Sequence, residues 1–127
     1  MLLLLVFLGF AAPATPHHSF AAEYDSTKPI KFTGTVTKFE WMNPHVYYYI
    51  DVKDASGKVT NWAVEGGTPN SLYRQGWGKN SLKVGDVVTV EGFMAKKAGS
   101  NHINGRSVTL PDGRRVFGGS SDDGGPQ

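Results

Sequence analysis

The four histidines are the most distinctive chemical groups of this 127-residue chain, which contains no cysteine. His17 and His18 are adjacent near the N-terminus, His45 follows an Asn-Pro pair, and His102 ends a stretch rich in Gly, Ser and Asn. Imidazole nitrogen binds copper, zinc and nickel, and the thioether of methionine binds Cu(I). The histidines therefore suggest a copper-type metal site, provided that the fold brings them together.

Other side chains that suit such a site lie beside the same segments. Met42 and Met94 border the two segments that carry His45 and His102, and the ring of Trp41 could cover a bound cation. The residues expected to face a ligand are Trp41, Asn43, Tyr47 and Tyr49. The alternative is that His45 only hydrogen-bonds the adjacent turn and that the His pair has no function, since short motifs without structural context are weak signals.

No pattern typical of a catalytic site is present. The sequence has no nucleophile elbow, phosphate-binding loop or dinucleotide fingerprint. The absence of cysteine excludes disulfides, Cys-based zinc sites and a thiol nucleophile. The acids Glu40, Asp51, Glu65 and Glu91 fall on different predicted strands, with no spacing that pairs them. We therefore expect a non-enzymatic protein whose only candidate cofactor is copper.

The charge balance argues against a nucleic acid or an anionic membrane surface as the partner. Thirteen Lys and Arg against eleven Asp and Glu give a formal net charge of +2, which is small for such partners. Tyr47 and Tyr49 share a strand face and could stack on bases, pack on neighbouring strands, or form an exposed aromatic patch. We expect a module that binds a small ligand. The alternative is a structural or protein-interaction module that uses the aromatic strand face.

The two ends of the chain differ in composition from its middle. Residues 1–12 contain no polar side chain; they are too few to span a bilayer but fit the apolar region of a secretory signal. Residues 12–14 supply a small-x-small cleavage pattern. We therefore expect a signal peptide over residues 1–14 and a periplasmic mature chain without a membrane span. An extended segment is expected over residues 15–29, and a disordered tail over residues 118–127.

Between these ends the hydrophobic pattern predicts one small β-rich domain over residues 30–117. Alternating apolar residues bounded by turn residues predict strands, over residues 30–41, 46–52, 59–65, 87–94, 106–110 and 114–117. A phase slip between Val36 and Phe39 indicates a bulge in the first strand. Thr68-Pro69 predicts the start of a short helix that ends before Gly76.

A short helix between the third and fourth strands favours a small OB-fold-like barrel. An SH3-like barrel is the alternative, but it normally has no helix there. An OB-fold meets its ligand between the loop after strand one and the loop before strand five; here these loops hold residues 42–45 and 96–102. The apolar residues predicted to form the core are Phe32, Val36, Val46, Tyr48, Ile50, Trp62, Val64, Val88, Val90 and Val108.

Several motifs together are similar to those of one family. They include His-His-Ser-Phe at 17–20, Gly-Thr-Val at 34–36, Trp-Met-Asn-Pro-His at 41–45, Ser-Leu-Lys-Val-Gly-Asp at 81–86 and Asp-Gly-Arg-Arg-Val-Phe at 112–117. The chain resembles the exported bacterial proteins grouped as "domain of unknown function 6152" from about His17 to Ser120. The resemblance implies export and this architecture, but no activity. Members commonly begin at or next to the His pair and carry an apolar residue at the position of His102, so this chain departs from the pattern in two places.

Overall fold

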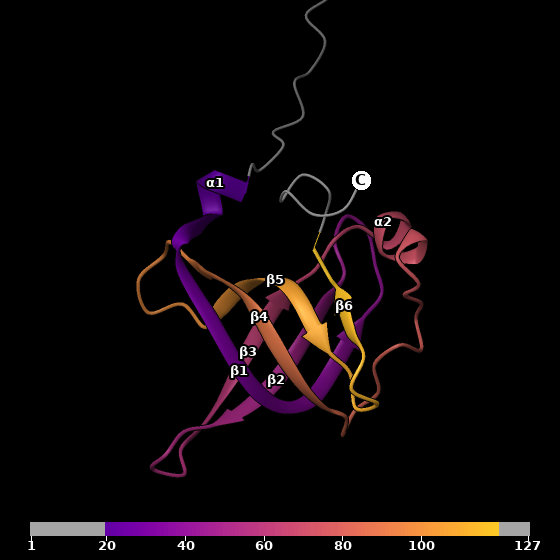
Figure 1. Ribbon diagram of the computed structural model, residues 1–127. Helices are drawn as coiled ribbons and strands as arrows, with labels where there is room; N and C mark the ends of the chain where they lie inside the picture. The colour runs from indigo at the N-terminus through magenta and orange to yellow at the C-terminus, as the bar shows by residue number, and fades with distance from the viewer. Residues whose placement is uncertain (1–19, 120–127) are drawn as a thin grey trace, which may run out of the picture.

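The computed structural model describes residues 20–119 of the chain, and within this range the backbone forms mainly β-structure (Figure 1). The two helices are short: α1 covers Phe20–Glu23 and α2 covers Pro69–Arg74. The strands are β1 Tyr24–Glu40, β2 Tyr47–Lys53, β3 Val59–Glu65, β4 Val87–Ala95, β5 His102–Thr109 and β6 Arg115–Phe117.

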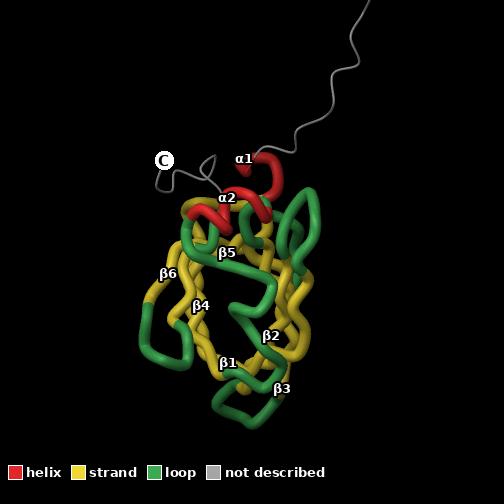
Figure 2. The backbone as a smooth tube through the Cα atoms, turned by 90° about the vertical axis from the view of Figure 1, so that its right-hand side faces the viewer, coloured by secondary structure: helices red, strands yellow, loops and turns green. Residues whose placement is uncertain are grey.

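The strands close into a ring, which is visible in Figure 2. Their order in the sheet is β3-β2-β1-β4-β5-β6, and all of these neighbours are antiparallel. A parallel pairing of β3 with β5, in which Val64 lies opposite Ile103, joins the two sides of the sheet. With α2 between β3 and β4, this topology confirms the predicted OB-like fold.

The long first strand serves both sides of the ring. Its first part pairs with β4 as far as Thr35, and its last part pairs with β2. The register with β2 shifts between Val36 and Lys38, which confirms the predicted bulge. The strand begins at Tyr24 rather than at Ile30, because Tyr24 pairs with Ala95 of β4. Pairing with a strand so distant in the sequence cannot be predicted from the local alternation of apolar and polar residues.

A compact core fills the ring, and α2 closes one end of it. Thr68 caps α2 as predicted, because its hydroxyl accepts a hydrogen bond from the Ser71 amide at 3.2 Å. Leu72, Trp77 and Leu82 are buried beneath this end. Eight of the predicted core residues are buried, namely Val36, Val46, Tyr48, Ile50, Val64, Val88, Val90 and Val108.

The other two predicted core residues, Phe32 and Trp62, are only partly buried. Their rings face each other with centroids 5.4 Å apart, although β1 and β3 are not neighbouring strands. The contact therefore crosses the interior of the ring. Nothing among residues 20–119 buries the pair fully, so these rings lie at the edge of the core rather than in its centre.

The barrel holds two residues of the expected C-terminal tail. Gly118 and Gly119 are buried, the Gly118 amide donates to the Arg106 carbonyl at 2.9 Å, and the Gly67 amide donates to the Gly118 carbonyl at 2.9 Å. Residues 120–127 lie outside the described residues, as do the expected signal segment and residues 15–19. Within residues 20–119, no helix has the length and apolar character needed to cross a membrane.

Candidate functional site

The parallel pairing of β3 and β5 places polar side chains together on the outer face of the barrel. Val64 and Ile103 lie opposite each other and are fully buried in the core. Neighbouring residues on a strand point to opposite faces, so Glu65 and His102 face outward. Glu65 is nevertheless only 8% exposed, because other side chains cover it.

Three side chains converge on the Glu65 carboxyl group. The Tyr24 hydroxyl donates a hydrogen bond to its Oε2 atom. The His102 Nε2 atom lies 3.6 Å from the same oxygen, and the His45 Nδ1 atom lies 3.5 Å from Oε1. We call Tyr24, His45, Glu65 and His102 the Glu65 cluster. Its members come from β1, the β1–β2 loop, β3 and β5.

The backbone around His45 fixes the orientation of its ring. Its Nδ1 atom lies 3.0 Å from the Gly66 carbonyl, which can only accept, so Nδ1 carries a proton. In the neutral ring the lone pair therefore lies on Nε2. The segment is tied down because the Val46 amide donates to the Gly67 carbonyl at 2.9 Å and the Gly66 amide donates to the Val46 carbonyl at 2.7 Å.

His102 is held by tyrosines on two sides. Its Nε2 atom lies 3.0 Å from the Tyr24 hydroxyl oxygen, and that hydroxyl donates its own hydrogen bond to Glu65. The oxygen can then accept a hydrogen bond from the His102 Nε2–H group, which leaves the lone pair of the neutral ring on Nδ1. The imidazole also lies 5.6 Å from the Tyr24 ring and 5.9 Å from the Tyr47 ring.

A hollow of about 300 Å³ opens beside this cluster, with Tyr24, Tyr47 and His102 in its wall. The rest of the wall comes from α1, the last residue of β4 and the β4–β5 loop. The loop is fastened to α1, because Lys96 Nζ donates to the Ala21 carbonyl and the Lys96 amide donates to the Glu23 carbonyl at 2.8 Å. In Figure 1, α1 stands at the start of β1, above this part of the barrel.

The structure describes two of the four histidines of the hypothesis. His45 and His102 lie against the two oxygens of one carboxyl group. His17 and His18 lie outside the described residues. The prediction that His102 belongs to a loop is wrong, because His102 begins β5 and pairs with Ala63 of β3. Strand five therefore begins four residues before the predicted Arg106.

The predicted site residues Trp41, Met42, Asn43 and Met94 differ in burial. Met42 and Asn43 are exposed on the β1–β2 loop. Trp41 packs against the core and against the Phe39 ring, whose centroid is 6.2 Å away. Met94 also packs against the core, so it lies on the inner face of the barrel, whereas Glu65 lies on the outer face. Among residues 20–119, no three His, Asp or Glu side chains are arranged to hold a metal ion.

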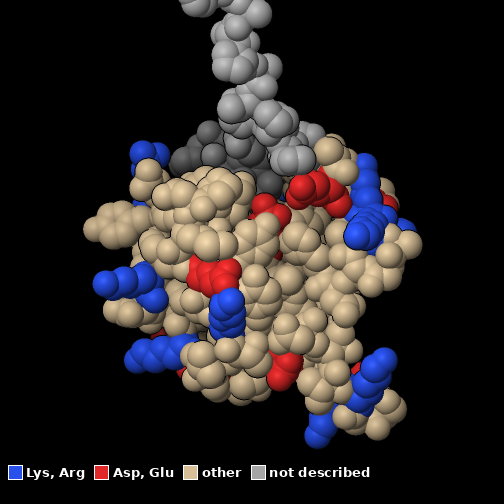
Figure 3. All heavy atoms as spheres, turned by 180° about the vertical axis from the view of Figure 1, so that it is seen from behind, with Lys and Arg blue, Asp and Glu red and all other residues tan. Residues whose placement is uncertain are grey.

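The two tyrosines of the predicted aromatic face are half-buried rather than fully exposed. Tyr47 lies against the His102 ring. The Tyr49 hydroxyl donates to Glu40 Oε2 at 3.5 Å, and Lys38 Nζ lies 5.5 Å from the centre of the Tyr49 ring. On the face drawn in Figure 3, basic and acidic side chains are interspersed over uncharged surface.

Sequence reasoning missed the two residues that organise the cluster, Glu65 and Tyr24. Glu65 is one of several acids on different predicted strands, and Tyr24 precedes the first predicted strand. One sequence feature points to Glu65. It ends a predicted strand next to Gly66-Gly67, and two residues without side chains leave room for other groups to approach closely.

The cluster predicts an alkaline limit to stability. Burial and the adjacent Glu65 raise the pKa of Tyr24 above its usual range. A raised pKa means that stability is complete below the unfolded value near 10 and is lost as pH rises above it. We expect the free energy of unfolding of Tyr24→Phe to fall less steeply above pH 10, by about 1.4 kcal/mol per pH unit, than that of the unmodified protein. Urea unfolding between pH 7 and 11.5 measures this, and parallel curves would contradict it.

Comparisons with known proteins give a family and distant structural similarity. The model described as "Family of unknown function (DUF6152)" matches residues 5–104. Among solved structures, the mitochondrial single-stranded DNA binding protein Rim1 of S. cerevisiae is similar with 13% sequence identity and a TM-score of 0.48, over 65% of this chain and 92% of that chain. The comparison with curated proteins found no match.

Proposed function

The chain belongs to DUF6152, a family of unknown function, as its motifs predicted. We propose that it is an exported, non-enzymatic protein that binds a copper-type metal ion beside the Glu65 cluster. One observation carries the proposal. His45 and His102 come from separate parts of the chain and lie against the two oxygens of one buried carboxyl group. Export is supported by the signal-like composition of residues 1–14.

The hydrogen bonds of the two rings favour metal binding. A histidine that binds a metal usually donates its other ring N–H to a carbonyl or a carboxylate, which fixes the ring and its tautomer. His45 donates through Nδ1 to Gly66, and His102 faces Tyr24 and Glu65 through Nε2. We assign the nitrogens that these contacts leave over, Nε2 of His45 and Nδ1 of His102, as the ligand atoms, with the Gly66 carbonyl orienting His45 and Glu65 orienting His102. The two side chains are 34% and 33% exposed, so an ion can reach them from solvent.

Two imidazoles do not complete a coordination sphere, and the proposal assigns the remaining positions to His17 and His18. His18 precedes Phe20 by two residues, which span at most about 7 Å of extended chain. The Phe20 ring packs against Tyr24 with centroids 5.6 Å apart. Phe20, the first residue that the structure describes after the His pair, therefore lies beside Tyr24 of the cluster. Nitrogen ligands bind copper(II) more tightly than the other first-row divalent ions.

A copper(II) titration of the mature chain, from Thr15 onward, tests the proposal. We expect binding tighter than micromolar by calorimetry, and nitrogen couplings in the electron paramagnetic resonance spectrum. His45→Ala and His102→Ala remove one ligand each and are expected to weaken binding at least tenfold, as is the double replacement of His17 and His18. Glu65→Gln keeps the shape of the orienting group without its charge and is expected to weaken binding about 10–100-fold.

Lys58→Ala is the control, because Lys58 is exposed on the β2–β3 hairpin and is expected to leave copper affinity unchanged. Affinity no better than micromolar would contradict the proposal. So would unchanged affinity in both His45→Ala and His102→Ala, because the His pair alone would then account for binding.

A further inference from the structure

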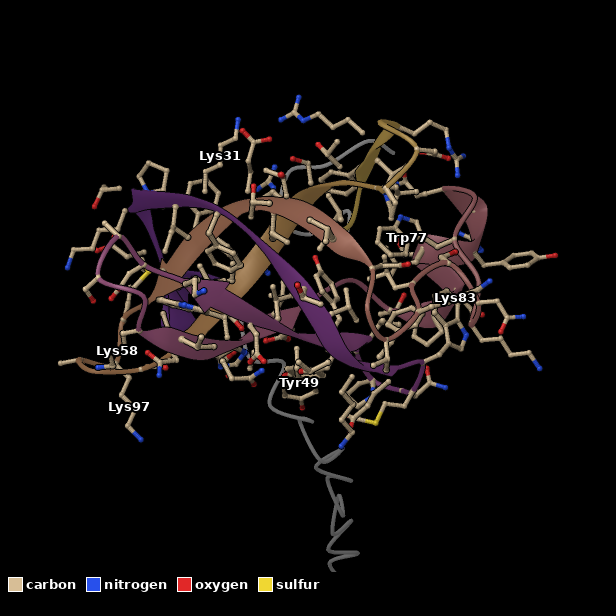
Figure 4. All side chains as sticks on the ribbon, turned by 90° about the horizontal axis from the view of Figure 1, so that it is seen from below. Lys31, Tyr49, Lys58, Trp77, Lys83 and Lys97 are labelled. Carbon is tan, nitrogen blue, oxygen red and sulfur yellow. The ribbon has the colours of Figure 1, made fainter. Side chains whose placement is uncertain are left out.

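A second hollow, of about 520 Å³, lies between the end of α2 and the start of the β1–β2 loop. Its wall consists of two aromatic residues and one short loop, namely Trp41, Tyr73, Gly78, Lys79, Asn80 and Ser81. None of these residues belongs to the Glu65 cluster or lines the hollow beside it. Figure 4 shows Trp77 and Lys83, which flank the loop in the sequence, on the opposite side of the barrel from Lys58. This hollow is therefore separate from the copper site.

The loop of the hollow has a fixed shape. Trp77 and Leu82, on either side of it, are buried in the core. Between them the Gly78 amide donates to Ser81 Oγ at 2.8 Å, and the Ser81 amide donates to the Gly78 carbonyl at 3.0 Å. The Trp77 indole also donates to the Phe117 carbonyl at 2.9 Å. A ligand therefore meets a preformed loop and does not have to order it.

Tyr73 presents its ring to solvent. It is 75% exposed, whereas its neighbour Leu72 is 1% exposed and holds α2 on the core. Trp41 is partly buried, because it packs against the core and against the Phe39 ring, and it forms one end of the hollow. Tyr73 is therefore the ring on which a ligand can lie, and Trp41 limits the hollow at one side.

The polar groups of the loop are available to a ligand. Lys79 and Asn80 are exposed, and within residues 20–119 neither side chain has a hydrogen bond or an ion pair. Ser81 Oγ accepts a hydrogen bond from the Gly78 amide, so its own proton is left to be donated. The loop therefore offers an ammonium group, an amide and a hydroxyl beside the Tyr73 ring.

The charge around the hollow is positive. Residues 66–85 contain Arg74, Lys79 and Lys83 and no acid. In the part of the chain that the structure describes, no carboxylate pairs with any of these three side chains. The formal net charge of +2 for the whole chain does not show this local excess. A negatively charged ligand is therefore attracted to this side of the barrel.

We propose that this hollow binds an acidic oligosaccharide, that is, linked sugar rings that carry carboxylates. The apolar C–H face of one sugar ring lies on Tyr73, its hydroxyl groups hydrogen-bond to Asn80 and Ser81, and a carboxylate pairs with Lys79. A hydrocarbon chain would leave the polar groups unsatisfied, and a compact anion would leave the Tyr73 ring uncovered. The volume falls within the range of about 300–1,000 Å³ that is usual for small-molecule sites.

Trigalacturonate is the probe, with maltotriose as the neutral control of the same length. Calorimetry of the mature protein is expected to show saturable binding of trigalacturonate with a Kd below about 1 mM, and binding of maltotriose at least about fivefold weaker. Because the charges are exposed, added salt is expected to weaken the binding of trigalacturonate only. Amide resonances of residues 73 and 78–81 are expected to shift during the titration.

Variants at two positions identify the groups that the sugar meets. Tyr73→Ala is expected to weaken trigalacturonate binding at least about tenfold, whereas Tyr73→Phe keeps the ring and stays within about twofold. Lys79→Gln is expected to lower the affinity for trigalacturonate to that for maltotriose. Lys58→Gln removes the same charge on the opposite side of the barrel and is expected to change neither affinity.

The high exposure of Tyr73 allows its replacement without loss of core packing. Equal affinities for the two sugars, or an unchanged affinity in Tyr73→Ala, would overturn the proposal. So would a thymidine oligonucleotide that binds this hollow more tightly than trigalacturonate, because Tyr73 would then recognise bases rather than sugar rings. The proposal uses no residue of the Glu65 cluster, so neither result affects the copper site.

Discussion

Replacing Ile50 with alanine is expected to lower the free energy of unfolding by about 2–5 kcal/mol. Ile50 is 0% exposed, and its strand pairs place it between Val36 of β1 and Trp62 of β3. The barrel cannot collapse easily onto the cavity, because strand pairing on both sides fixes the backbone. Such a loss is a large part of the roughly 5–15 kcal/mol that stabilises a small domain. Urea unfolding followed by tryptophan fluorescence measures it.

The control for this prediction is Lys58→Ala. The Lys58 side chain is exposed on the β2–β3 hairpin and is seen at the margin of the molecule in Figure 4. Its amide donates to Asp54 Oδ1 at 3.0 Å, and this backbone contact survives the replacement. The change is expected to be within about 0.5 kcal/mol. Similar losses in both variants would mean that the strand does not present Ile50 to the core.

The parts of the fold that were predicted correctly are those with local causes. Strand β3 was predicted with its observed bounds, Val59–Glu65, because alternation and the flanking turns are contained in the segment itself. The helix from Pro69 was predicted from a capping residue and the proline after it. The bulge in β1 was predicted because it reverses the side-chain alternation over a few residues.

The wrong strand boundaries occur where pairing with a strand distant in the sequence determines the secondary structure. The predicted loop included residue 102, and the predicted fifth strand began only at residue 106, yet residues 102–105 form the first half of β5 because β3 and β4 pair with them. Residues 24–29 were predicted to belong to an extended segment before the barrel, yet β1 starts there because β4 continues to Ala95 and pairs with Tyr24. Pairing between distant segments supplies hydrogen bonds that the local sequence does not encode.

The same limit applies to the candidate site. The OB topology predicted that the loops carrying His45 and His102 would face one region, because the fold fixes where these loops lie. It did not predict that Glu65 would lie between them. A carboxylate at the end of a strand is usually exposed, but Tyr24, His45 and His102 reach Glu65 from other strands and loops and help to bury it.

Replacing Gly92 with alanine is expected to destabilise the protein by about 3 kcal/mol, at the upper end of the usual cost of overpacking. Gly92 pairs with Gly105 next to a register shift between β4 and β5. A Cβ atom on Gly92 would lie 1.9 Å from the Asn104 carbonyl oxygen, so the two strands must separate. The obstacle is backbone rather than a flexible side chain, and rotamer changes cannot relieve it. Thermal and urea unfolding measure the loss.

The matched control is Gly78→Ala, because a Cβ atom there meets nothing within 4 Å and the residue is not in a left-handed conformation. It is expected to change stability by no more than about 0.5 kcal/mol. The strand displaced by alanine at position 92 is β5, which also carries His102 into contact with Tyr24. The Gly92 variant is therefore expected to shift the amide resonances of residues 102–105 as well, whereas Gly78→Ala leaves them in place. Equal stability of the two variants would mean that β4 and β5 do not approach this closely in solution.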